Sequence, residues 1–202
     1  GHMGIISIFG DVVLPVEHDH VGPLSDSLAL VIDQGKCGYV DAKGAWVIPE
    51  RYGADALTIN RGDFHNGVAR VLSAGKLGLI DTKGEKVFPA LYADIGLLES
   101  GVVPVKKKNK WGYASRAFTT VVEAKYDQAW EMHGGYAKVE LGGLFGLVDS
   151  TGKETIKPAY TALGDLDHGL LTATSETGTG IVSPDGKVVV PLTYDEVAWE
   201  GD

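Results

Sequence analysis

Short apolar runs alternate with polar turn residues along most of the chain. From Gly38 to Tyr52 the order is glycine, two apolar residues, aspartate, two spacers, glycine, an apolar run, proline and a closing aromatic residue. The same order returns from Gly78 to Tyr92. Two apolar runs joined by Asp-x-x-Gly are typical of a β-hairpin, because the aspartate can accept bonds from the backbone ahead and glycine tolerates the positive φ of the turn. We therefore predict antiparallel hairpins over both stretches.

This hairpin pattern occurs six times in register. Successive units begin 34 residues apart, except that 40 residues separate the second from the third. The fourth unit lacks the turn aspartate, the second glycine and the proline, and carries Ser115, Phe118 and Glu123 instead. A fixed period of this length is typical of a repeat architecture. The units begin at Gly4, Gly38, Gly78, Gly112, Gly146 and Gly180.

A further apolar segment precedes each of the last five hairpins, at 28–31, 68–71, 102–105, 136–139 and 170–173. Its second and fourth positions are apolar, and in four of the five copies the third is Arg70, Pro104, Lys138 or Thr172. This alternation predicts a strand with one buried face and one solvent face, which places Pro104 on an edge strand. We expect the proline of each hairpin to end its second strand. The segment after each closing aromatic residue is either a short fourth strand or one helical turn.

The pattern predicts an all-β fold of six β-meander repeats. A meander of about 34 residues cannot bury its apolar face alone, so neighbouring repeats must stack. A β-propeller-like ring hides its edges, whereas an open β-solenoid or superhelix needs polar ends. Because the first unit (5–9) is as apolar as the inner copies, we favour the ring and keep the open superhelix as the alternative. We interpret residues 1–3 as an expression-tag remnant and residues 4–202 as one domain.

Composition narrows the possible partners. The chain has 18 Lys and Arg against 27 Asp and Glu, a net charge of −9, which disfavours nucleic acid and anionic membranes as partners. The apolar runs are too short to span a bilayer, so we expect no membrane insertion. The one cysteine, Cys37, cannot form an internal disulfide and leaves the compartment open between cytoplasm and periplasm. We expect a monomer.

No group of residues in the sequence predicts catalysis or metal binding. Asp41, Asp81 and Asp149 each open a turn, so we interpret them as turn residues rather than as general acids or metal ligands. The run from His18 to His20 has two imidazoles, but it occupies the closing register of the first repeat and has no third ligand nearby in the sequence. We therefore expect no enzyme activity, no metal and no cofactor.

The 6-residue insertion of the second repeat, within residues 58–65, is one candidate binding loop. A longer loop on a regular scaffold is a common place for specificity. From it we take Arg61, Asp63, Phe64 and His65 as candidate binding residues. The alternative is a surface insertion that the fold tolerates without a function.

Basic and aromatic residues give two further candidates. Lys106, Lys107, Lys108 and Lys110 lie beside Trp111 in the fourth repeat and could bind an acidic partner, although a solvated hairpin turn has the same composition. Trp130 and Trp199 each lie in the segment after a closing aromatic residue. They could stack on sugar rings, or they could pack between neighbouring repeats.

The repeat resembles the WG-repeat family of bacterial proteins, named for a Trp-Gly pair that opens each hairpin. Lys110-Trp111-Gly112-Tyr113 carries the full pair, and looser copies stand at 36–39, 76–79 and 145–147. This resemblance covers nearly the whole chain. It implies a repeat module without enzymatic activity, found in cytoplasmic, periplasmic and secreted bacterial proteins. The family's loose similarity to cell-wall-binding repeats suggests a carbohydrate function.

These observations support two hypotheses for function. The first is a scaffold for protein–protein interaction with an acidic surface, of which an inhibitor or immunity protein against a basic toxin enzyme is one example. The second is a cell-wall or carbohydrate-binding module, in which aromatic residues bind peptidoglycan or another glycan.

Overall fold

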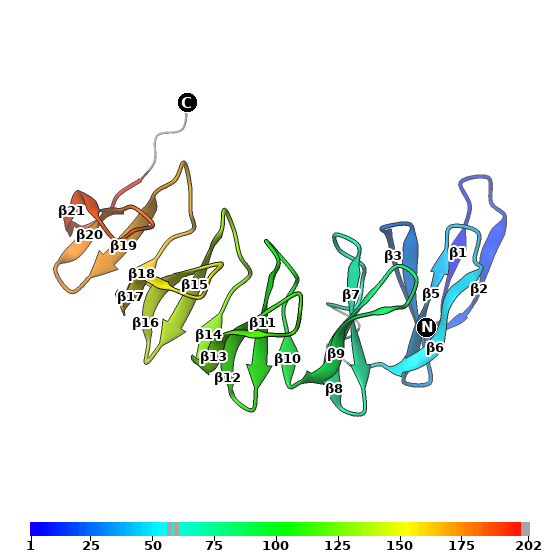
Figure 1. Cartoon of the computed structure of the whole chain (residues 1–202). Helices are drawn as coiled ribbons and strands as arrows, with labels where there is room; N and C mark the ends of the chain where they lie inside the picture. Colours follow the sequence, from blue (N-terminus) through cyan, green and yellow to red (C-terminus); the bar gives the residue numbers. More distant parts are fainter. Residues whose placement is uncertain (56–57, 59–60, 199–202) are drawn as a thin grey trace. The chain divides into compact units, whose positions relative to one another are not determined.

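The computed structural model describes residues 1–55, 58 and 61–198. The chain divides into two compact units, Gly1–Ile95 and Gly96–Asp202, and the described part of each is built from antiparallel strands (Figure 1). The predicted all-β fold with repeated meanders is therefore confirmed. The ring, the open superhelix and the single domain of residues 4–202 stay predictions.

Unit 1 contains a two-stranded sheet, β1-β2, and a seven-stranded sheet that runs in sequence order from β3 to β9. Because each described strand pairs with its neighbour in sequence, most contacts are local, as expected for successive meanders. The strands are β1 (Met3–Ile6), β2 (Val12–His18), β3 (His20–Ser25), β4 (Leu28–Asp33), β5 (Lys36–Asp41), β6 (Trp46–Gly53), β7 (Val68–Ser73), β8 (Lys76–Asp81), β9 (Lys86–Tyr92) and β10 (Asp94–Ile95).

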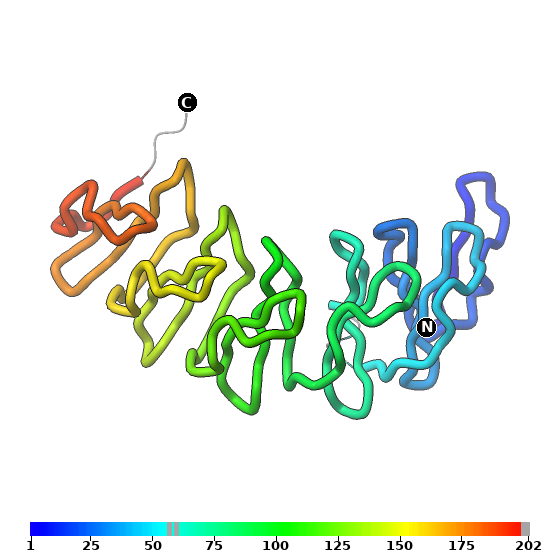
Figure 2. The backbone as a smooth tube through the Cα atoms, viewed as in Figure 1, coloured from blue at the N-terminus to red at the C-terminus, as the bar shows by residue number. Residues whose placement is uncertain are grey.

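Unit 2 contains the meander β11-β12-β13 and two four-stranded sheets, β14-β15-β16-β17 and β18-β19-β20-β21. The chain folds back in similar turns through each of them (Figure 2). The short strands β14 and β18 follow a closing aromatic residue, so in these repeats the segment is a fourth strand and not a helical turn. The strands are β11 (Val102–Lys107), β12 (Lys110–Ser115), β13 (Thr120–Tyr126), β14 (Gln128–Ala129), β15 (Tyr136–Leu141), β16 (Leu144–Asp149), β17 (Glu154–Tyr160), β18 (Ala162–Leu163), β19 (Leu171–Ser175), β20 (Gly178–Val182) and β21 (Val188–Tyr194).

Each hairpin contains a bulge that the sequence pattern encodes. In the pair β5-β6, Cys37 lies opposite Tyr52, and two residues later Tyr39 lies opposite Ile48. The partner strand therefore advances by four residues while β5 advances by two. Pro49 lies inside this bulge, where its missing N–H removes no regular ladder bond. The prediction that the proline ends the second strand is wrong, because β6 continues through it to Gly53.

The first glycine of every repeat faces this bulge at close range. A Cβ on Gly38 would lie 2.5 Å from the carbonyl oxygen of Ile48 and 2.7 Å from the amide nitrogen of Glu50. Both are backbone atoms of the paired strand and cannot rotate away, so any side chain would force the strands apart. The corresponding Cβ would lie within 2.6 Å of a backbone oxygen at Gly4, Gly78, Gly112, Gly146 and Gly180 as well.

The predicted Asp-x-x-Gly turns are confirmed. Asp41 Oδ1 accepts hydrogen bonds from the N–H groups of Lys43 (2.8 Å) and Ala45 (3.0 Å), and Gly44 has a φ of +77°. Asp81 and Asp149 accept the equivalent bonds in their own turns. These aspartates are turn residues, as the repeat register predicted.

These turns predict acid sensitivity. The N–H groups of Ala45 and Lys43 hold the pKa of Asp41 below its ordinary value. A carboxyl group whose pKa is lower in the folded state stabilises the fold above its unfolded pKa, and this stabilisation is lost as the pH falls through the folded pKa. We expect a carboxyl ¹³C titration to place the pKa of Asp41 below 3.8. The urea midpoint should fall less between pH 5 and pH 2 in Asp41→Asn than in the wild type. A titration of Asp41 at or above the ordinary value would contradict this account.

In three repeats the residue at the third position of the strand before the hairpin bonds to a neighbouring segment of the chain. Pro104 is buried on β11, opposite Tyr113, and its carbonyl accepts the N–H of Gly96 at 2.8 Å. Strand β11 thus has partners on both sides, and the prediction of an edge strand is wrong. Arg70 on β7 donates to the carbonyl of Ile95 at 2.6 Å, and Lys138 on β15 donates to that of Leu163 at 3.2 Å.

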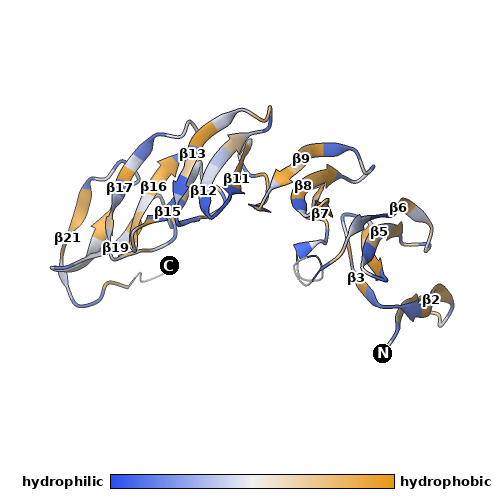
Figure 3. Ribbon diagram, turned by 90° about the horizontal axis from the view of Figure 1, so that it is seen from below, coloured by the Kyte–Doolittle hydropathy of each residue, from blue (hydrophilic) through white to orange (hydrophobic). Residues whose placement is uncertain are grey.

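The apolar positions of the strands form separate cores along the chain. Figure 3 shows hydrophobic and hydrophilic segments alternating along single strands such as β13 and β17. In unit 1, Tyr39 lies in a cluster with Ile48 and Phe64. In unit 2, one cluster surrounds Tyr113 and another surrounds Leu147. Each cluster combines strands of one meander with residues of the next, so stacking supplies the core that one repeat lacks.

Candidate functional site

A buried tyrosine ties the second repeat to the segment that follows it. Tyr39 is fully buried, and its hydroxyl donates to the carbonyl of Gly62 at 2.7 Å. Phe64 packs against the tyrosine edge-to-face, with 4.8 Å between ring centroids. The phenol therefore fills an apolar space and satisfies its hydroxyl on a backbone carbonyl.

The fourth repeat uses the same contact in unit 2. Tyr113 is fully buried, and its hydroxyl donates to the carbonyl of Trp130 at 2.8 Å. Met132 lies two residues after Trp130, as Phe64 lies two residues after Gly62, and belongs to the same core cluster as Tyr113. Two repeats thus hold a phenol between a meander and the following segment in the same way.

The fifth repeat has Leu147 at the position of these tyrosines, as the third repeat has the fully buried Leu79. The backbone position equivalent to Gly62 and Trp130 is Gly164, and the position equivalent to Phe64 and Met132 is Leu166. A leucine is shorter than a tyrosine and has no hydroxyl to donate. At this place the structure contains a cavity of about 660 Å³, lined by Leu147, Gly164, Leu166 and neighbouring residues. Its volume is in the range of ligand-binding pockets.

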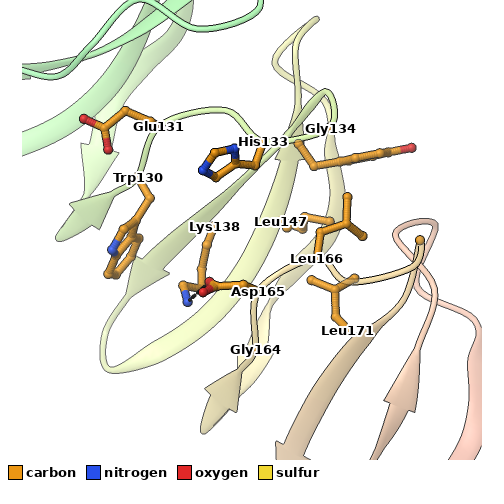
Figure 4. Close-up of a pocket in the computed structure, with 12 residues that line it drawn as sticks. Trp130, Glu131, His133, Gly134, Lys138, Leu147, Gly164, Asp165, Leu166 and Leu171 are labelled. Carbon is orange, nitrogen blue, oxygen red and sulfur yellow. Dashed lines mark hydrogen bonds and ion pairs between the residues drawn. The ribbon is translucent and has the colours of Figure 1, made fainter. Parts of the chain in front are cut away.

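Figure 4 shows how the walls of the cavity are arranged. Leu147 and Leu166 lie together on one side, His133 lies above them, and Lys138 and Asp165 lie below. Lys138 Nζ is 3.0 Å from Asp165 Oδ1, so the two side chains form an ion pair at the rim. The carboxylate of Glu131 points away from Leu166 (Figure 4). The cavity therefore combines an apolar floor with a polar, charge-paired rim.

Trp130 stands at a position that is alanine in the sixth repeat (Ala198) and glycine in the other four, namely Gly22, Gly62, Gly96 and Gly164. Its side chain is 37% exposed and borders the cavity. Lys138 Nζ lies 5.4 Å from the centroid of the indole, within the range of a cation–π contact. The indole is thus held in place beside the cavity by a neighbouring charged side chain.

A comparison with protein families identifies the repeat. The family described as "WG containing repeat" matches residues 78–111, 111–145, 145–173 and 180–200, more than half of the chain. The chain belongs to the WG-repeat family. The resemblance seen in the sequence is confirmed. The units that begin at Gly4 and Gly38 lie outside the matched segments.

Solved structures resemble this WG-repeat chain only distantly. Hsv2p of Kluyveromyces lactis is 12% identical with a TM-score of 0.49, and the match covers 85% of this chain and 63% of Hsv2p. A Bacteroides caccae protein of unknown function is 14% identical with a TM-score of 0.36, over 86% and 80% of the two chains. PorZ, a surface component of the type-IX secretion system of Porphyromonas gingivalis, is 14% identical with a TM-score of 0.40, over 78% and 24%.

The WG-repeat chain thus spans less than two thirds of the length of Hsv2p. With TM-scores below 0.5, these similarities carry no argument about function. No curated protein matches the chain.

The described residues of the insertion in the second WG repeat pack within unit 1. Phe64 is 2% exposed and lies in the core, and Arg61 forms an ion pair with Asp94 at 3.2 Å. Burial raises the pKa of Asp63, whose Oδ1 is buried with no hydrogen-bond partner in the described part of the chain. His65 is exposed. Of the four residues predicted from this loop, His65 presents the most accessible side chain.

The basic run of the fourth WG repeat is divided between contacts and solvent. Trp111 is 8% exposed in the core, and Lys106 Nζ lies 5.5 Å from its ring centroid. Lys110 forms an ion pair with Asp127, whereas Lys107 and Lys108 are exposed. Among the predicted residues, Trp130 is the one that borders the cavity. Trp199 lies outside the described residues.

The remaining candidate chemistry is internal to the fold. His18 bonds through Nδ1 to the carboxylate of Asp33, and Cys37 is fully buried, which raises the pKa of its thiol to about 12. Among the described residues, no group of three His, Cys, Asp or Glu side chains is placed to hold a metal ion. No helix in the described part of the chain is long and apolar enough to cross a membrane.

Proposed function

We propose that this WG-repeat chain is a non-catalytic scaffold that binds another protein, and that the cavity of unit 2 receives part of that partner. The observation that carries the proposal is the cavity of about 660 Å³ beside Trp130, at a place where two other repeats have a buried tyrosine. A half-exposed tryptophan next to an apolar depression is the usual composition of a binding hot spot.

The charge of the chain favours a basic partner. A net charge of −9 attracts a positively charged protein at long range and raises the rate of encounter. An inhibitor or immunity protein against a basic enzyme would use this property. Binding of such a partner should weaken as the salt concentration rises, because salt screens exposed charges.

The scaffold is tested by a purified complex. Proteins from the source cell that bind the wild type are purified and titrated back against the wild type and Trp130→Gly by calorimetry. We expect a stoichiometric complex whose Kd rises at least about tenfold in Trp130→Gly, since a buried aromatic contact contributes at least about 1.4 kcal/mol at a hot spot. Trp46→Ala is the control, because Trp46 is 42% exposed in unit 1. A partner that binds Trp130→Gly as tightly as the wild type would contradict the role of the cavity.

Carbohydrate binding is the second candidate function. The exposed face of Trp130 beside the cavity is the observation that favours it, because sugar rings stack on aromatic side chains. In this case insoluble peptidoglycan should remove the wild type from solution and leave Trp130→Ala behind. Retention of both proteins on the glycan, or of neither, would exclude Trp130 as a sugar platform.

A further inference from the structure

We infer that the cavity of unit 2 recognises a phenol group, and that its occupant is a tyrosine side chain presented by a protein partner. This inference rests on the proposed function for the source of the tyrosine. The recognition of the phenol itself follows from the internal contacts of the repeats.

The fold already binds phenols at two equivalent places. The rings of Tyr39 and Tyr113 are each fully buried between a meander and the next segment, and each hydroxyl donates to a backbone carbonyl, that of Gly62 or Trp130. The chain supplies these two phenols itself. The two contacts therefore show that the backbone of this repeat can hold a buried phenol at this position.

The fifth repeat changes the residue at the centre of this contact, and Tyr136 lines its cavity where Leu28 and Val102 belong to the cores of the other two repeats. Leu166 takes the place of Phe64 and Met132 and packs against the cluster that contains Leu147. Gly164 occupies the position of Gly62 and Trp130, whose carbonyls accept the tyrosine hydroxyls in the other two repeats. Leu147 cannot reach or bond that carbonyl as a tyrosine does. A phenol that enters from outside can lie over Leu147 and donate its hydroxyl to the Gly164 carbonyl.

The lining of the cavity fits a phenol better than an anion or a sugar. The floor residues Leu147 and Leu171 are at most 3% exposed, and hydroxyl groups of a sugar buried against them would lose their partners. Lys138, the cation at the rim, is already paired with Asp165 and bonded to the carbonyl of Leu163. A flat apolar ring with one hydroxyl suits this surface, and the cavity leaves room for the peptide that carries it.

The probe for this inference is p-cresol, the side-chain analogue of tyrosine, with toluene as the analogue that lacks the hydroxyl. We expect p-cresol to shift the methyl resonances of Leu147 and Leu166 in NMR titrations, with a Kd in roughly the millimolar range expected for so small a ligand. Toluene should bind about five- to tenfold more weakly, because one buried hydrogen bond is lost. Intermolecular NOEs from the cresol ring should reach both leucines.

Leu147→Tyr is the decisive variant, because it restores the residue that two other repeats have. It should fill the cavity and abolish p-cresol binding. Leu91→Tyr is the matched control, since Leu91 is 67% exposed in unit 1, and it should leave binding unchanged. Should Leu147→Tyr fail to fold, the NOEs and the toluene comparison in the wild type still decide.

Each outcome bears on one of the two proposals. Equal binding of toluene and p-cresol, NOEs confined to other residues, or shifts at Leu147 caused by chito-oligosaccharides but not by p-cresol would overturn phenol recognition. A protein complex that is lost in Trp130→Gly but forms normally in Leu147→Tyr would overturn it too, while the scaffold function stands. If p-cresol binds but the chain forms no protein complex, the scaffold function is overturned, and so is the proposal that a protein partner presents the tyrosine.

Discussion

Gly38→Ala is expected to lower the free energy of unfolding of unit 1 by about 3–4 kcal/mol, because overpacking against rigid backbone is costly. The added Cβ would lie 2.5 Å from the carbonyl oxygen of Ile48 and 2.7 Å from the amide nitrogen of Glu50. A flexible side chain could rotate away from such a contact, but the backbone of the paired strand can give way only if the bulge opens. Urea denaturation followed by far-UV circular dichroism measures the effect.

Gly35→Ala separates this effect from the general preference for glycine. Gly35 has a φ of +74°, but a Cβ there would meet nothing within 4 Å. Its replacement should cost only about 1–2 kcal/mol, the strain of a left-handed conformation. Equal losses in Gly35→Ala and Gly38→Ala would show that close approach of the strands does not explain the first glycine of the repeat.

The fold was largely predictable because its signals are local and repeated. The Asp41 turn depends on residues within four positions of one another. Its hairpin joins two consecutive strands, and six aligned copies separate the pattern from chance. The bulge was missed because Pro49 on its own is compatible both with the end of a strand and with a bulge. Which of the two forms depends on Gly38, which lies opposite the bulge on the paired strand. The linear pattern does not show that these two residues face each other.

The side chains between neighbouring meanders were harder to predict. Arg70 and Lys138 alternate with apolar residues, which is typical of a solvent face, yet both donate to carbonyls of a following strand. Long basic side chains can extend over apolar surface and still form hydrogen bonds at their tips. The alternation of apolar and polar residues alone therefore does not identify the solvent-exposed face of a strand. Phe64 was proposed as a binding residue because it lies in an insertion, whereas the structure buries it against Tyr39.

The cavity was only partly predictable. Trp130 was selected from the sequence as an aromatic residue of a variable segment, and it does border the cavity. Leu147 was not selected, although the alignment of repeats sets it beside Tyr39 and Tyr113. Tyrosine and leucine both fit an apolar position of the strand, so the change between them does not alter the pattern of apolar and polar residues. Its meaning depends on the hydroxyl contact with the next segment, which only the structure shows.

Tyr39→Leu should reproduce in the second repeat what Leu147 does in the fifth. The variant removes a fully buried ring and leaves the Gly62 carbonyl without the hydroxyl that bonds it. We expect a loss of about 2–4 kcal/mol in the free energy of unfolding, as for other large-to-small core changes. Tyr39→Phe keeps the ring and should lose only about 1–2 kcal/mol, the cost of the unpaired carbonyl. Urea denaturation of both variants measures the difference.

Addition of p-cresol should restore part of the stability of Tyr39→Leu. A ligand that binds only the folded state stabilises it by RT ln(1 + [L]/Kd), which is about 1.4 kcal/mol at ten times the Kd. Toluene should restore less, and Tyr39→Phe should gain nothing from either compound at this site because its ring still fills the space. If p-cresol fails to stabilise Tyr39→Leu while cresol NOEs at Leu147 persist in the wild type, Phe64 has collapsed into the space. If both effects are absent, the contact of Tyr39 with Gly62 is no guide to the ligand of the fifth repeat.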